Sequence, residues 1–189
     1  MISRSAKSFL LVGFSILGVT PVLSSFACRS LAPRPAATAT ANDNEELTRI
    51  FQEDQDDRSP EEKEGKSTDW TIVGPRDKAR ESRVKEFYWD GSLHTGADYY
   101  HAAMVLQHAD TANDYLLAHE LCIAAIGKGE QRAKWLAAAS EDRFLMTIGR
   151  PQRFGTQYRA DGPNADFRLY PLAPGVTDDL RRAFDVPKP

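Results

Sequence analysis

The stretch from residue 115 to residue 126 constrains the fold more than any other part of this chain. Only His119 and Glu120 are polar within it, and a helix that is apolar on nearly every side is buried on nearly every side. Glycines at positions 127 and 129 supply a stop for that helix. With 189 residues, 41% of them hydrophobic, the chain is long enough to pack a core around it. The pattern therefore predicts a buried helix at the centre of one domain.

Three further helices are expected from the spacing of apolar residues. Residues 76–89 and 98–109 would form one antiparallel hairpin, and residues 113–126 and 130–148 a second. Each hairpin is roughly 35 residues long with small residues at the crossings, which is typical of tetratricopeptide-like pairs. Pro75 is well placed to open the first helix, after an extended piece at residues 71–73.

Helix caps are expected at three further positions. Asp98 would cap the second helix and either Asn113 or Asp114 the third. Thr177 would cap a short final helix over residues 178–184. The sequence thus places the start of each of these helices at a side chain that can accept from free backbone N–H groups.

The tail after residue 149 is expected to close the two hairpins, because solenoids of this kind normally need at least three repeats. Residues 150–158 are polar and aromatic without a regular period, and residues 167–172 have an extended pattern. The predicted fold class is all-α: two antiparallel helical hairpins, closed by a mostly irregular C-terminal strap and a short final helix.

Residues 1–27 have the charged, apolar, small order of a secretory signal peptide. The apolar run at residues 9–23 is shorter than the roughly 20 residues that span a bilayer. Small residues at Ser25 and Ala27 suit ordinary signal peptidase. Cys28 could instead become the acylated first residue of a lipoprotein, although Ser25 and Phe26 depart from the usual lipobox. The sequence predicts an exported protein, either free in the periplasm or anchored to the outer membrane through a lipidated Cys28.

Residues 28–68 are expected to form a disordered acidic tether, and residues 69–189 the helical domain. Between residues 42 and 65, ten acidic residues stand against three basic ones, too polar a composition to offset the entropy of ordering. A short helix at residues 45–56 around Leu47, Ile50 and Phe51 is the one structured element considered there. The weak net charge of −3, without a basic cluster, argues against nucleic acid as a partner.

No residue pattern identifies a cofactor, a metal site or a catalytic centre. His101 and His108 share a helix face, but a metal needs three or four converging ligands. After His119 and Glu120 the zinc-protease pattern fails, because an isoleucine stands where the second histidine must be. Cys122, in an apolar helix, is interpreted as a small hydrophobic residue. We therefore expect no metal and no cofactor, and binding rather than catalysis.

The candidate ligand-binding residues are polar groups in the apolar helices, at the helix turn and in the strap. They are His108, Asp110, Glu120, Asp142, Arg143, Gln152, Thr156 and Gln157. A charge inside an apolar helix is costly to bury unless it is paired. Two interpretations stay open. One is a structural ion pair among Glu120, Asp142 and Arg143, between the third and fourth helices. The other is a polar pocket closed by Gln152, Thr156 and Gln157.

Three segments carry a family resemblance. They are Gln-His-Ala-Asp at 107–110, Trp-Leu-Ala-Ala at 135–138 followed by Asp142-Arg143, and Gly-Arg-Pro-Gln-Arg-Phe-Gly-Thr-Gln at 149–157. Together they make residues 98–158 resemble a bacterial family of domains of unknown function. The resemblance covers about a third of the chain closely. It implies an all-helical domain of bacterial origin and supplies no activity.

The leading hypothesis from the sequence is an exported helical domain that binds a protein, a peptide or a small ligand. An alternative is a hydrolase-like enzyme with a pocket that contains His108, Asp110, Arg143 and Gln157. A third interpretation treats residues 149–157 as a structural strap only.

Overall fold

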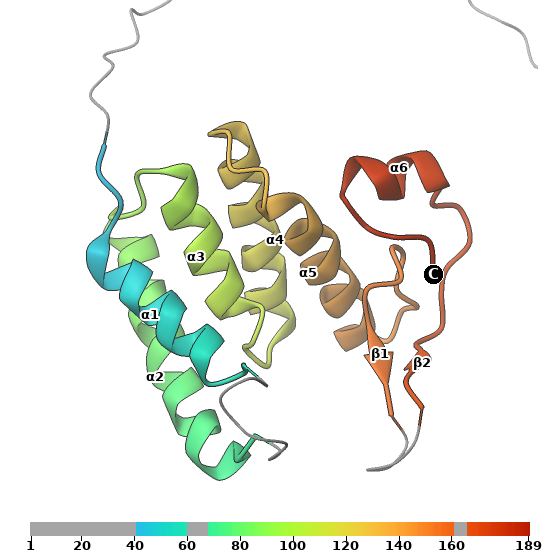
Figure 1. The fold of residues 1–189 in the computed structure, drawn as a ribbon, viewed down its shortest axis with the longest axis horizontal. Coiled ribbons are helices and arrows are strands. Elements are labelled where there is room, and N and C mark those ends of the chain that lie inside the picture. The colour runs from blue at the N-terminus through green and yellow to red at the C-terminus, as the bar shows by residue number, and fades with distance from the viewer. Residues whose placement is uncertain (1–40, 60–67, 161–165) are drawn as a thin grey trace, which may run out of the picture. The chain divides into compact units, whose positions relative to one another are not determined.

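Helices dominate the residues that the computed structural model describes, which are 41–59, 68–160 and 166–189 (Figure 1). The helices are α1 (Glu45–Asp56), α2 (Trp70–Trp89), α3 (Gly96–Leu106), α4 (Ala112–Gly127), α5 (Ala133–Thr147) and α6 (Asp178–Ala183). Two short strands, β1 (Tyr158–Arg159) and β2 (Arg168–Leu169), form an antiparallel pair. The expected all-α class is therefore right at this coarse level. The signal peptide and Cys28 lie outside the described residues.

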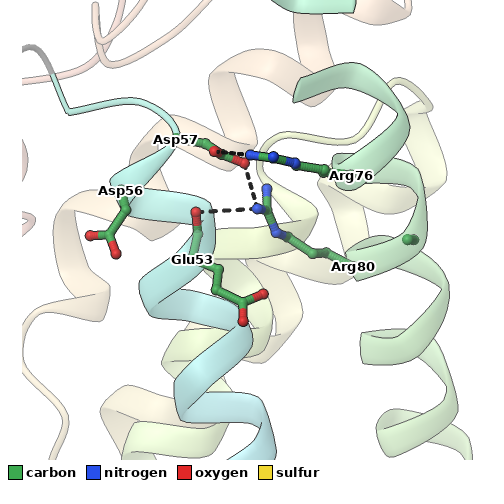
Figure 2. A pocket seen from close by; sticks show the side chains of 6 residues that line it. Glu53, Asp56, Asp57, Arg76 and Arg80 are labelled. Atoms are coloured by element: carbon green, nitrogen blue, oxygen red, sulfur yellow. Dashed lines mark hydrogen bonds and ion pairs between the residues drawn. The ribbon is translucent and has the colours of Figure 1, made fainter. Parts of the chain in front are cut away.

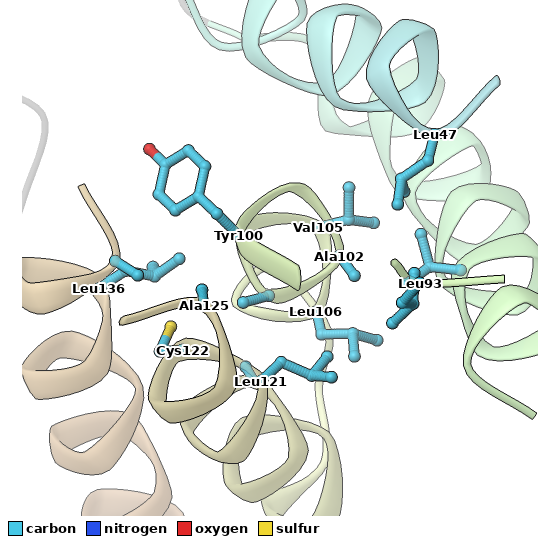
Figure 3. Close-up of a cluster of buried hydrophobic side chains, with 14 of the residues drawn as sticks. Leu47, Leu93, Tyr100, Ala102, Val105, Leu106, Leu121, Cys122, Ala125 and Leu136 are labelled. Atoms are coloured by element: carbon cyan, nitrogen blue, oxygen red, sulfur yellow. The ribbon is translucent and has the colours of Figure 1, made fainter. Parts of the chain in front are cut away.

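The centre of the domain is α3. It packs against α1, α2, α4 and α5, and seven of its eleven residues are buried. Figure 3 shows Val105 and Leu106 of this helix inside the main apolar cluster. The prediction that residues 115–126 form the central helix is wrong, because α4 packs mainly on α3 and α5. It leaves Leu116 37% and Ile123 56% exposed.

Helix α1 belongs to the fold, so the predicted domain start at residue 69 is wrong. Asn44 caps the helix by accepting from the backbone N–H of Leu47 at 3.0 Å. The side chains of Leu47 and Ile50 are buried in the main apolar cluster. Packing of this apolar face stabilises a helix that its own acidic composition would not. The predicted disordered tether therefore fails at residues 45–58, whereas residues 28–40 and 60–67 lie outside the described ranges.

Several helices begin earlier than their sequence suggests. Thr95, not Asp98, caps α3, and the two form a capping box. Thr111 caps α4, ahead of both predicted caps. The cap of α6 at Thr177 is confirmed.

Helix α2 runs through Pro75 and does not begin there. Residues 71–73 are helical, so the extended piece expected at these positions is wrong. Pro75 removes one backbone hydrogen bond from the helix. Capping by Asp69 and burial of Val73 both favour the earlier start.

The strap, residues 150–159 and 166–177, lies against α5 and is fixed to α6. Arg181 of α6 donates to the carbonyl oxygens of Phe154, Arg153 and Val176 at 3.0 to 3.2 Å. A second small apolar cluster joins Ala138 of α5 to Phe154 and Val186. None of the helices in the described part of the chain is long and apolar enough to cross a membrane.

Candidate functional site

A polar pocket of about 400 Å³ is formed by residues from α2, the α3–α4 turn and α5, together with Arg58, which follows α1. Its lining consists of Arg58, Trp70, Gly74, Asp77, Lys78, Glu81, His108, Asp110 and Arg143. We call it the Arg143 pocket. It brings together three of the residues singled out from the sequence, namely His108, Asp110 and Arg143.

His108 is oriented by a buried carboxylate. Asp54 of α1 is fully buried, and its Oδ2 and Oδ1 lie 2.9 and 3.1 Å from His108 Nδ1. Arg58 Nη1 donates to the same carboxylate at 2.9 Å. His108 Nε2 has no hydrogen bond to a described residue, and it is not sealed from solvent. The imidazole is thus fixed through Nδ1, and the residue lines the pocket while its Nε2 has no hydrogen-bond partner among the described residues.

The carboxylates that line the pocket all have cationic partners. Asp77 lies 2.6 Å from Arg58 Nη2 and 3.1 Å from Arg80 Nη1. Lys78 Nζ lies 2.9 Å from Glu81 and 3.0 Å from Asp110. The acidic groups of the pocket are therefore already neutralised by the protein itself.

Arg143 differs from the other cations of the pocket because its partners are neutral. Nε donates to Gln157 Oε1 at 3.1 Å, and Nη1 donates to the Gln107 carbonyl at 2.8 Å. Within the described ranges no carboxylate is close enough to pair with it. Burial lowers the pKa of Arg143, and the Arg58 cation lowers it further, while Tyr115 raises it. Since arginine stays protonated in proteins, the pocket contains an uncompensated positive charge.

Asp142 does not form the ion pair that the sequence suggested. It is fully buried and accepts four hydrogen bonds from the strap. Oδ1 accepts from the N–H groups of Arg153 (2.6 Å) and Phe154 (2.9 Å), and Oδ2 accepts from Thr156 N (3.0 Å) and Oγ1 (2.8 Å). The carboxylate is satisfied by backbone N–H groups, so it needs no cation.

Gln152 is likewise a structural residue of the strap. Its fully buried amide donates from Nε2 to the carbonyls of Gln157 and Tyr170, both at 3.0 Å. Its Oε1 accepts from Gln157 N–H at 2.9 Å. Its side chain therefore holds two strap segments together and does not line the Arg143 pocket.

The predicted residues thus divide into two groups. His108, Asp110 and Arg143 line the pocket, whereas Asp142, Gln152 and Thr156 fix the strap. Gln157 connects the groups, because its side chain accepts from Arg143 and donates to Thr156 Oγ1 at 2.9 Å. Glu120 is exposed on α4, outside the lining of the Arg143 pocket and outside the strap hydrogen bonds of Asp142 and Gln152.

Sequence reasoning missed Asp54 and Arg58, because both fall in the segment predicted to be a tether. A signal was present: Leu47, Ile50, Phe51 and Asp54 share one helical face. An aspartate on the apolar face of a short helix indicates a buried carboxylate that needs a partner.

A second pocket, shown in Figure 2, lies between α1 and α2 and is lined by Glu53, Asp56, Asp57, Arg76, Ala79 and Arg80. Asp57 Oδ1 accepts from Arg76 Nη1 at 2.8 Å, and Asp57 Oδ2 accepts from Arg80 Nη2 at 2.5 Å. Both arginines are paired there, so this pocket has the character of an ion-pair network between helices. Across the described ranges, no group of three or more His, Cys, Asp or Glu is placed to hold a metal ion.

No protein-family model, curated protein or solved structure matches this chain. The chemistry of the Arg143 pocket is therefore inferred from its lining residues alone.

Proposed function

We propose that this chain is an exported helical ligand-binding domain, and that the Arg143 pocket takes a small anionic ligand. The observation that carries the proposal is the pairing pattern: the lining carboxylates have cationic partners, whereas among the described residues Arg143 has only neutral ones. A guanidinium presents a planar set of donors that fits carboxylates and phosphates. A bound anion would balance the positive charge of the Arg143 guanidinium.

The size and the second donor of the pocket support the same class of ligand. A volume of about 400 Å³ is at the small end of the range for small-molecule sites. When His108 is protonated, both ring nitrogens donate hydrogen bonds. Nε2 can then donate to the anion while Nδ1 still donates to the Asp54 carboxylate. The exposed indole of Trp70 offers an apolar wall for the rest of the ligand.

The proposal includes the cellular setting expected from the sequence. The domain would work in the periplasm, free or held at the outer membrane through a lipidated Cys28. We also propose that the chain belongs to the bacterial family that its motifs resemble. We further propose that α2 pairs with α3, and α4 with α5, in tetratricopeptide-like hairpins. Mass spectrometry of the mature N-terminus tests export and anchoring. Diacylglycerol on Cys28 supports anchoring, an unmodified N-terminal residue 28 or 29 contradicts lipidation, and retention of residues 1–27 contradicts cleavage.

Titration with simple anions tests the binding site. We expect sodium phosphate or sodium succinate, added at constant ionic strength, to shift the NMR signals of Arg143 Nε and His108 Nε2 saturably. Arg143→Gln should abolish the saturable shift at His108. Arg150→Gln, which removes an exposed arginine outside this pocket, is the matched control and should leave it intact. Linear shifts, or equal shifts in Arg143→Gln, would contradict an anion site.

A hydrolase-like enzyme is a second candidate, favoured by the contact between Asp54 and His108 Nδ1. An imidazole held by a carboxylate with its other nitrogen open is the arrangement of an oriented general base. Release of nitrophenol from p-nitrophenyl acetate or phosphate, lost in His108→Asn, would support it. Saturable anion binding without such turnover would favour a binding domain.

The structural role of the strap is supported separately. The bonds of Asp142 and Gln152 to strap backbone groups match the interpretation of residues 149–157 as a strap. That role is compatible with an anion site at Arg143. Asp142 and Gln152 bond to backbone groups of the strap, whereas the Gln157 side chain accepts a hydrogen bond from the Arg143 guanidinium.

A further inference from the structure

Both ends of α1 are fixed by buried carboxylates. At the first end, Asp98 Oδ1 of α3 accepts from the N–H of Asn44 at 2.7 Å, while its Oδ2 accepts from the N–H groups of His94 and Thr95. At the other end, Asp54 of α1 binds His108. Each contact joins residues 54 positions apart in the chain, so neither forms unless α1 is docked on α3.

Between these ends α1 is held by packing. The ring of Phe51 stacks on His101 of α3, with centroids 4.2 Å apart and planes 14° from parallel, and Leu47 and Ile50 are buried in the same interface region. His101 and His108, seven residues apart on one face, therefore both contact α1. Helix α1 lies alongside α3 and also contacts α2 (Figure 1), so it is an outer element of the domain.

Docking of α1 also builds part of the Arg143 pocket. Arg58, two residues beyond the end of α1, lines the pocket and is held there by Asp54 at 2.9 Å and Asp77 at 2.6 Å. Asp54 in turn orients His108. If α1 leaves, the pocket loses Arg58 from its wall and His108 loses the group that fixes its ring.

We propose that occupancy of the Arg143 pocket and docking of α1 are coupled. An anion in the pocket stabilises the docked helix, and undocking of α1 dismantles the binding site. The inference rests on the proposed anion site. Because coupling between two equilibria is reciprocal, any factor that releases α1 also weakens ligand binding. The part of the chain that precedes α1, where the export signal is predicted, therefore joins the domain at the element that senses the ligand.

Hydrogen exchange of the full mature chain tests the coupling, with sodium phosphate as the probe at ten times the dissociation constant found in the Arg143 titration. Outer elements open locally with lower free energy than the core. If phosphate binds only when α1 is docked, exchange of the α1 amides should slow about tenfold. The slowest amides of α4, which report global unfolding, show independently whether phosphate binds the native protein.

The two readouts separate the possible failures. Slower exchange in α4 with unchanged exchange in α1 would overturn the coupling and leave the anion site standing. Unchanged exchange in both, together with no saturable shift at Arg143, would overturn the anion site and the coupling with it. Arg143→Gln should abolish the effect on α1. Arg49→Gln, which changes an exposed residue of α1 that pairs with Glu53 of the same helix, should preserve it.

Discussion

Replacing Asp142 with asparagine should loosen the strap from α5. The change keeps the shape of the side chain but turns one of its two acceptor oxygens into an amide donor. The Thr156 hydroxyl can rotate and accept from that donor, but the Thr156 N–H cannot. The smallest loss is therefore one buried N–H without a partner, together with the negative charge that strengthens the two bonds on the other oxygen.

The expected cost follows from these contacts. An unsatisfied buried N–H costs about 1–3 kcal/mol, and hydrogen bonds to a charged acceptor are roughly twice as strong as neutral ones. Together they give a loss of about 3 kcal/mol in the free energy of unfolding. For a domain of this size such a loss lowers Tm by about 6–12 °C.

Urea unfolding followed by circular dichroism measures the cost, and hydrogen exchange at residues 153–157 locates it. Glu141→Gln is the control, because it removes a partly exposed ion pair between α5 and Arg153 and should cost less than about 1 kcal/mol. If Asp142→Asn is no more destabilising than Glu141→Gln, the buried carboxylate does not hold the strap against α5.

Three further predictions concern the core. Burial lowers the pKa of His101. Below the ordinary histidine pKa of about 6.5, the unfolded chain therefore binds a proton at this residue more readily than the folded protein does. The free energy of unfolding should fall as the pH drops from about 7 through that value. His101→Phe should show a flatter dependence in urea titrations at pH 7 and pH 5, and an equal slope would refute the assignment. Burial raises the pKa of the Cys122 thiol to about 12. In a Cys28→Ser variant, Ellman's reagent should therefore label Cys122 only when the protein unfolds. Rapid labelling of the native protein would contradict this prediction. Leu47→Ala should lower the free energy of unfolding by about 3 kcal/mol, because the leucine side chain is fully buried. Gln52→Ala, on the exposed face of the same helix, should change it little. Equal losses in the two variants would place residues 45–56 outside the core.

The sequence by itself determined where most of the helices form and where the last of them begins. Apolar spacing and glycine stops predicted segments close to α3, α4 and α5, and Thr177 was correctly expected to cap α6. Polar residues within or beside apolar helices also marked His108, Asp110 and Arg143, which line one pocket. These features depend on neighbours within a few residues, which a sequence pattern records directly.

Tertiary structure alone decided which elements meet. The apolar face of α1 indicates that Asp54 is buried, but no local pattern indicates that its partner is His108, 54 positions further along the chain. The most apolar segment, α4, is not the centre, because burial depends on how many helices surround an element and α3 has more. Asp142 found backbone N–H groups where the sequence suggested a cation. Local periodicity fixes which face of a helix is apolar, but the partner of each face, and of each buried charge, is set by long-range packing that no local pattern contains.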